Sequence, residues 1–273
     1  HLLHGCLLLF AGVAALIPRE KLVADSNSAE KLALSPDGKS MGFISADENQ
    51  NRNVFTFRIS DRRKRQVTFE QRDVLDFSWT GVQDIITFSE DTDGEENLMF
   101  FKKNISESAT QHERTIISNT PGVQAQLVDN NKRDRFILIG INDDTPSRVH
   151  VYNFDLVTNE LSRVFTNTRF AVDSIGTDND MRIRLAYEQQ EYGTRKYFRK
   201  ELLPQRKFSS NMVEELVDLL DLQYELFFLT SFLGFDKRNK NVYWIWGEDT
   251  GKGELIVAPF SDFSKRKVSI DRA

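Results

Sequence analysis

The sequence predicts an all-β fold that is built from repeated units of four short strands. Short runs rich in β-branched and aromatic residues alternate with turn clusters from about residue 30 to about residue 200, and again from about 226 to 262. Equivalent runs recur roughly every 40 to 50 residues, which is the period of a four-stranded β-propeller blade. About five such blades fit into the 273 residues.

The first two units show the pattern most clearly. In the first unit, a turn at 35–38 precedes a strand over 39–45, and a second strand over 53–59 alternates apolar with polar residues. In the second unit, strands are predicted at 74–79, 84–89 and 98–101. An acidic turn at 91–97 separates the last two of these strands.

The remaining units follow in order, with one interruption. The third unit has strands at 125–128, 136–141, 149–154 and 161–165, and a weaker fourth unit runs from 171 to about 208. The fifth unit has strands at 232–236, 242–246 and 254–260. Between the last two units, the segment 212–220 has apolar residues at spacings i, i+1, i+4, i+5 and i+8, which predicts a short amphipathic helix or a turn that connects two blades and packs on the core.

The composition of the chain limits the classes of binding partner that are expected. Charged residues make up 28% of the chain and the formal net charge is −5, so no broad basic surface for nucleic acid is expected. The basic run at 61–66 lacks interleaved aromatic residues and is interpreted as a solvated turn. Cys6 is the single cysteine, which excludes an internal disulfide and a cysteine-based zinc site. No cofactor or metal is expected.

The first 17 residues form an apolar leader that is set apart from the propeller expected over 18–273. The leader has the length of a signal-peptide remnant and is too short to span a bilayer comfortably, although it could instead pack in ordered form against the domain. We therefore expect a secreted or periplasmic protein, with a cytoplasmic location as the alternative, and no membrane association once the leader is removed. The propeller is expected to be incomplete at its C-terminus. The isolated chain is expected to aggregate or dimerise through its exposed edge and blade face.

Several segments carry a resemblance because they occur together and in order. They lie at 16–23, 33–39, 65–69, 77–79, 91–97, 121–126, 151–156 and 158–161. In this order they resemble the successive blade motifs of the prolyl oligopeptidase family of serine peptidases, in particular its dipeptidyl and acylaminoacyl peptidases. The resemblance covers roughly residues 16 to 262.

This resemblance implies a propeller of about seven blades that covers an α/β-hydrolase domain with a Ser, Asp and His triad. The chain would then be the non-catalytic gating and substrate-screening propeller of a serine peptidase, and its partners would be peptide substrates and the hydrolase domain of the same parent protein. The alternative is a stand-alone propeller that binds a protein or peptide as a scaffold. A weaker third hypothesis is a degenerate fragment of a former enzyme.

We expect no catalytic residue in the chain. A hydrolase of this class places its serine in a Gly-x-Ser-x-Gly elbow between a strand and a helix, and we expect neither this pentapeptide spacing nor a triad in the chain. His1 and His4 lie in the leader, His112 lies in a polar stretch, and His150 alternates within a predicted strand. A packing or solvent-facing role is therefore expected for His150.

Two groups of residues are candidates for substrate binding. Glu95, Glu96 and Asn97 in the acidic turn could meet the amino terminus of a peptide, and Arg148 ends a polar loop that begins at residue 142 and could contact substrate or the hydrolase domain. For both groups the competing interpretation is an ordinary solvated loop. The acidic turn also lacks the length and distal glutamate of an EF-hand calcium loop. Separately, residues 104–106 (Asn-Ile-Ser) match the N-glycosylation acceptor pattern of eukaryotic secretory proteins.

Overall fold

The described residues of the computed structural model fold into five four-stranded antiparallel sheets. The model describes residues 29–91, 98–146, 148–167, 175–189, 194–200, 216–222, 230–248 and 252–268. Within each sheet, four strands that are consecutive in the chain pair in chain order. The prediction of an all-β propeller with four-stranded blades, about five of them visible in this chain, is therefore confirmed.

We number the sheets 1 to 5 along the chain. Sheets 1 and 2 contain β1 (Glu30–Leu34), β2 (Ser40–Ala46), β3 (Arg52–Arg58), β4 (Lys64–Gln66), β5 (Val74–Trp79), β6 (Ile85–Asp91), β7 (Leu98–Asn104) and β8 (Thr115–Ser118). Sheets 3 and 4 contain β9 (Ala125–Asp129), β10 (Phe136–Thr145), β11 (Arg148–Asp155), β12 (Leu161–Phe165), β13 (Ile175–Thr177), β14 (Ile183–Gln189), β15 (Arg195–Lys200) and β16 (Leu216–Leu222). Sheet 5 contains β17 (Ser231–Phe235), β18 (Asn241–Glu248), β19 (Lys252–Pro259) and β20 (Lys267–Val268), with a short 3-10 helix at Phe263–Lys265.

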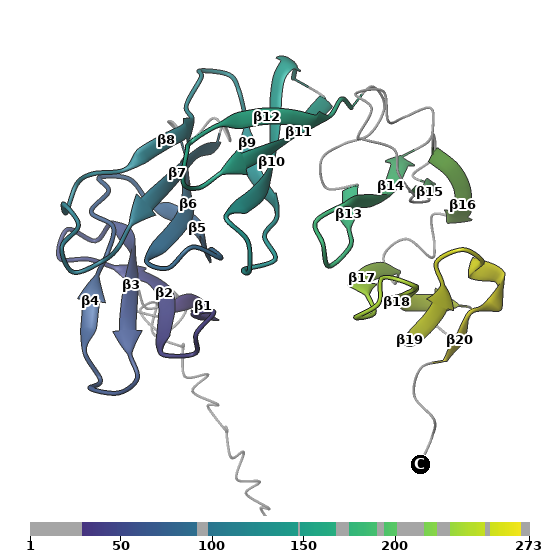
Figure 1. Ribbon diagram of the computed structural model, residues 1–273, viewed down its shortest axis with the longest axis horizontal. Coiled ribbons are helices and arrows are strands. Elements are labelled where there is room, and N and C mark those ends of the chain that lie inside the picture. Colours follow the sequence, from purple (N-terminus) through teal and green to yellow (C-terminus); the bar gives the residue numbers. More distant parts are fainter. Residues whose placement is uncertain are drawn as a thin grey trace, which may run out of the picture.

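The five sheets follow one another along an arc (Figure 1). The first strands β1, β5, β13 and β17 lie toward its concave side, and the last strands β4, β8, β16 and β20 lie toward its outside. Each junction between neighbouring sheets is filled by a cluster of buried apolar side chains drawn from both. A single four-stranded sheet leaves both faces in water, so stacking on a neighbour is what buries its apolar residues.

The junction between sheets 4 and 5 is built around one aromatic side chain. Trp244 is fully buried. Its ring meets those of Tyr197, Phe232 and Phe263 edge-on, with centroid distances of 5.1, 5.3 and 5.7 Å. Edge-to-face geometry at these distances is favourable beyond the apolar area that it buries. The aromatic side chains around Trp244 therefore pack in the junction between these two sheets.

The turns that join the first two strands of sheets 1, 4 and 5 share one design. Each begins with Ser or Asp and places its fourth residue in the left-handed region, with φ of 72° at Gly38, 55° at Met181 and 56° at Asn239. In sheet 5, Asp236 Oδ1 accepts hydrogen bonds from the backbone N–H groups of residues 238 and 240. A short polar side chain at the first position therefore fixes the turn, as an Asx-type turn does.

One predicted element was wrong. Leu216–Leu222 forms strand β16 and pairs with β15, so the part of 212–220 that the structure describes is not a helix. Sheet 4 accordingly ends at Leu222 and not near residue 208. Short apolar runs satisfy helical and extended spacing alike, and here the backbone groups of β15 supply the pairing partner that decides the outcome.

Within the described ranges, no helix is long and apolar enough to cross a bilayer. The apolar leader at 1–17, with Cys6, lies outside the described residues.

Candidate functional site

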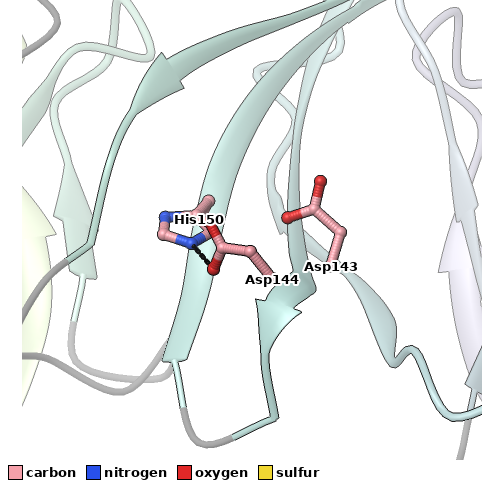
Figure 2. A group of neighbouring side chains, drawn as sticks. All are labelled: Asp143, Asp144 and His150. Atoms are coloured by element: carbon pink, nitrogen blue, oxygen red, sulfur yellow. Dashed lines mark hydrogen bonds and ion pairs between the residues drawn. The ribbon is translucent and has the colours of Figure 1, made fainter.

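A polar cluster lies next to the turn of the β10–β11 hairpin in sheet 3, and Figure 2 shows its residues Asp143, Asp144 and His150. The polar cluster consists of Asp143, Asp144, His150, Tyr152 and Arg163. His150 pairs across the ladder with Ile141, and Tyr152 pairs with both Ile139 and Arg163. Directly paired residues share a face of a sheet, so His150, Tyr152 and Arg163 come together from two strands. A register shift between Ile141 and Thr145 then brings the two carboxylates over them.

Arg163 organises one half of the polar cluster. Its Nε donates a hydrogen bond to the Tyr152 hydroxyl at 2.8 Å, and the same hydroxyl donates to Asp143 Oδ2 at 2.5 Å. The guanidinium also pairs with Asp143 at 3.1 Å and with Asp144 at 3.3 Å. Both carboxylates are thus already matched by one cation.

His150 organises the other half and has a defined tautomer. The ring is 3% exposed. Its Nδ1 lies 2.9 Å from the backbone nitrogen of Asn167 and accepts that N–H, so the proton of the neutral ring is on Nε2. Nε2 therefore donates to Asp144 Oδ1 at 2.5 Å, along the dashed line in Figure 2. Both ring nitrogens are used.

The electrostatics of the polar cluster follow from these contacts. The hydrogen bond from His150 holds the pKa of Asp144 below its usual value, and Arg163 adds to the effect. Burial, with the hydrogen bond to Asp143, raises the pKa of Tyr152 to about 12. Near neutral pH, Tyr152 therefore keeps its proton and acts as a donor.

The polar cluster does not fit a metal ion, although donor atoms of Asp143, Asp144 and His150 all lie within 4.8 Å of one another. A cation would have to displace the Arg163 guanidinium from both carboxylates. It would also need a lone pair on His150, whose Nδ1 is occupied by Asn167 and whose Nε2 bears the proton. The donors already satisfy one another.

A nucleophile elbow can be tested directly, because residues 38–42 (Gly-Lys-Ser-Met-Gly) do match the Gly-x-Ser-x-Gly spacing. The expectation that this spacing would not occur in the sequence was therefore wrong. The structure nevertheless places Ser40 at the start of β2, after a turn, and not between a strand and a helix. Gly38 supplies the positive φ of the turn, and Gly42 makes room for the rings of Phe77 and Trp79.

No histidine base accompanies this serine among the described residues. The groove of about 830 Å³ that Ser40 helps to line, between sheets 1 and 2, contains no histidine. His150 belongs to sheet 3, and His112 is exposed with its ring edge against Phe69. A triad therefore does not form in the described part of the chain.

The structure describes only part of the predicted substrate-binding set. Arg148 begins β11 opposite Thr145, at the same end of the hairpin as the polar cluster, and is exposed. Glu95, Glu96 and Asn97 lie outside the described residues, in the segment that connects β6 to β7. Those strands occupy the same positions in sheet 2 that β10 and β11 occupy in sheet 3.

Sequence reasoning found the loop but not the contacts within it. It noted the polar stretch that starts at residue 142, yet it did not select Tyr152 or Arg163. The available signal was the alternation along β11, which places His150 and Tyr152 on one face. The partner on β12 could not be chosen without the strand register.

Four-stranded antiparallel sheets that follow one another and pack face to face define a β-propeller. No protein-family model matches the chain. In sequence it is 37% identical over 268 residues to dipeptidyl peptidase family member 6 of Caenorhabditis elegans, an alignment that covers 96% of this chain and 35% of that protein. The chain thus spans about a third of its relative.

Solved structures show the same fold. Oligopeptidase B from Trypanosoma brucei aligns with 93% of this chain and 36% of its own, with a TM-score of 0.62 and 12% identity. The β-propeller domain of the trilobed protease from Pyrococcus furiosus aligns with 89% of this chain and 71% of its own, with a TM-score of 0.53 and 14% identity. Over almost its whole length the chain is similar in sequence to part of a dipeptidyl peptidase family member, and it shares the propeller fold of these peptidase structures. The resemblance predicted from the sequence is therefore confirmed.

Proposed function

We propose that the chain is the gating and substrate-screening propeller of a secreted or periplasmic serine peptidase whose catalytic domain lies elsewhere in the same protein. The carrying observation is the 37% identity to a segment that makes up 35% of a dipeptidyl peptidase family member. A chain that contains this segment and has no triad among its described residues depends on another domain for catalysis. Its proposed partners are that domain and peptide substrates.

The proposed contact with substrate uses the end of the sheets at which turns join strands two and three of each blade. Arg148 is exposed there, at the same end of the β10–β11 hairpin as the polar cluster. A guanidinium is suited to a peptide carboxylate or carbonyl group. Glu95, Glu96 and Asn97 are proposed to meet the cationic amino terminus of a peptide.

The proposal that the catalytic serine lies outside this chain is tested with an alkyl-fluorophosphonate probe, which labels activated serines. We expect the full-length protein to be labelled on one serine and the purified 273-residue chain to remain unlabelled. Labelling of any serine in the short chain, Ser40 in particular, would show that the non-catalytic assignment is wrong. If the full-length reading frame contains no second domain with a nucleophile, the stand-alone scaffold hypothesis replaces the proposal.

The substrate-contact proposal is tested by kinetics on the full-length protein. We expect Glu95→Gln and Glu96→Gln to raise KM for peptides with a free amino terminus by about tenfold, the loss of one charged contact of about 1.4 kcal/mol, and to leave acetylated peptides unchanged. Arg148→Ala should raise KM for both kinds of peptide. Glu107→Gln is the matched control, because Glu107 is an exposed carboxylate beyond β7, at the opposite end of that strand from the 92–97 segment. Equal effects of Glu96→Gln and Glu107→Gln would refute the assignment.

A further inference from the structure

Asn104 is the first residue of an Asn-Ile-Ser acceptor triplet that occurs once in the sequence. It is the last residue of β7 and is exposed. The triplet therefore continues from an ordered strand into a surface turn.

The Asn104 side chain is held in one orientation by the residue that completes the triplet. Its Oδ1 accepts a hydrogen bond from the backbone N–H of Ser106 at 2.9 Å, which is the geometry of an Asx turn. Its amide nitrogen donates no hydrogen bond to the described residues. The atom that a sugar would modify is therefore free to face solvent while the rest of the side chain is fixed.

The backbone of the triplet is anchored from beneath. Ile105 is 6% exposed and packs in the cluster between sheets 1 and 2, and its N–H donates to the carbonyl of Asp84 at 2.7 Å. Arg65 donates to the carbonyl oxygens of Ile105 and Ser106. A substituent on Asn104 can be accommodated without moving the turn.

We propose that Asn104 carries an N-linked oligosaccharide. In the modification, Nδ2 forms a bond to the anomeric carbon of the sugar and loses one proton, while the bond from that carbon to a lipid-linked pyrophosphate breaks and the pyrophosphate leaves with the electron pair. The donor is a lipid-linked oligosaccharide of the eukaryotic secretory pathway. The proposal shares with the proposed function only its secreted location.

The sugar would lie at the end of the strands where the turn that joins β7 and β8 emerges. Ile105, Ser106 and Glu107 line the groove between sheets 1 and 2. This turn joins the third and fourth strands of its sheet, whereas the β10–β11 turn joins the second and third. In an antiparallel sheet these two kinds of turn emerge at opposite ends of the strands. The oligosaccharide would therefore leave the polar cluster and Arg148 uncovered.

The test is site-specific mass spectrometry of the full chain, secreted from eukaryotic cells behind a cleavable signal and treated with peptide-N-glycosidase in heavy-oxygen water. We expect the peptide that contains residue 104 to show conversion of glycosylated Asn to heavy-oxygen Asp. Asn104→Gln and Ser106→Ala should abolish the modification, and Ser106→Thr should retain it. Ser106→Thr also controls for folding, because it keeps the acceptor pattern.

Two results would overturn the proposal: an unmodified Asn104 in the secreted chain, or an unmodified Asn104 in the full-length protein purified from its own cells. The readout is occupancy of one residue and does not involve peptidase activity. Failure here would leave the screening proposal standing, and failure of the screening kinetics would leave this one standing.

Discussion

Individual glycines set how closely neighbouring sheets approach. A Cβ atom at Gly42 would lie 2.7 and 2.8 Å from two atoms of the Phe77 ring and 3.1 Å from Trp79. At Gly81 it would lie 2.2 Å from the backbone oxygen of Asp134, in the turn between β9 and β10 of the next sheet. A ring can shift within a junction, whereas the backbone of Asp134 is held by the hydrogen bond from its N–H to Asn131 Oδ1.

We therefore expect Gly42→Ala to lower the free energy of unfolding by about 1–3 kcal/mol, the usual range for overpacking, and Gly81→Ala to lower it by more. Urea denaturation of both variants gives the ranking. Adding Phe77→Leu to Gly42→Ala should recover part of the loss, because it shortens the side chain that clashes. If the two substitutions instead lower the free energy of unfolding additively, the contact with Phe77 is not the cause of the loss in Gly42→Ala.

Glu90 is a buried carboxylate held by a neighbouring arginine. It is 3% exposed. Arg114 pairs with it at 3.0 Å, also pairs with Glu70, and stacks over Phe101 at 4.1 Å. Burial raises the pKa of Glu90 above its ordinary value, with Arg114 opposing and Glu70 adding to the rise.

This pKa shift predicts the direction of a pH effect. The folded state binds the Glu90 proton more tightly than the unfolded chain, so this residue lowers stability progressively as pH rises from the unfolded pKa of about 4.3 through the higher folded pKa. Glu90→Gln cannot titrate. We expect the difference in unfolding free energy, Glu90→Gln minus wild type, to become more positive between pH 4 and pH 7. A pH-independent difference would contradict the shift.

At the scale of elements, His150 ties the β11 strand to the connection that follows β12. Its Nδ1 accepts the buried backbone N–H of Asn167, whereas its other partner, Asp144, has a side chain that is 51% exposed. Removal of the His150 ring takes away the acceptor of the buried Asn167 N–H. Removal of the Asp144 carboxylate instead takes away a contact at a position that water can reach.

We accordingly expect His150→Ala to destabilise the protein by about 1–3 kcal/mol and Asp144→Ala by less than about 1 kcal/mol. Thermal unfolding of the two variants measures both. Nitrogen NMR of the wild-type ring should find the proton on Nε2. A larger loss for Asp144→Ala would mean that the carboxylate contact, and not the Asn167 contact, holds this region.

The sequence predicted strands well where each one had its own signal. The alternation in 53–59 and the turn chemistry at 35–38 correspond to β3 and to the β1–β2 turn. β16 was missed because seven residues with five apolar positions suit two conformations, and only pairing with β15 distinguishes them. The contact between Tyr152 and Arg163 was not predicted for a related reason. Which residues of two different strands lie opposite each other depends on the strand register, which the sequence does not give.

At the scale of the whole molecule, the sheets are joined by junctions between chain neighbours. Substituting the fully buried Trp244 should therefore weaken one junction first. We expect Trp244→Ala to reduce stability by about 3–5 kcal/mol and to raise amide hydrogen exchange mainly in sheet 5, while sheets 1 and 2 stay protected. Exchange that rises evenly in all sheets would indicate a single cooperative unit.

The arc also bears on the behaviour of the chain in solution. Exposed Leu32 and Leu34 lie on β1 of sheet 1, and Leu233 and Val268 are exposed on sheet 5. The prediction that the isolated chain aggregates or dimerises therefore stands, and light scattering tests it. A monodisperse monomer that melts cooperatively would refute it.

Stacking in chain order has a consequence for biosynthesis. Each sheet closes from residues that leave the ribosome together, and its next apolar partner is the sheet translated immediately afterwards. Domains assemble during synthesis at about 5–20 residues per second, so a sheet of roughly 45 residues waits a few seconds for its neighbour. The most recently completed sheet is then the one with an exposed apolar face, and a stall in translation would leave that surface open to chaperones or to another nascent chain.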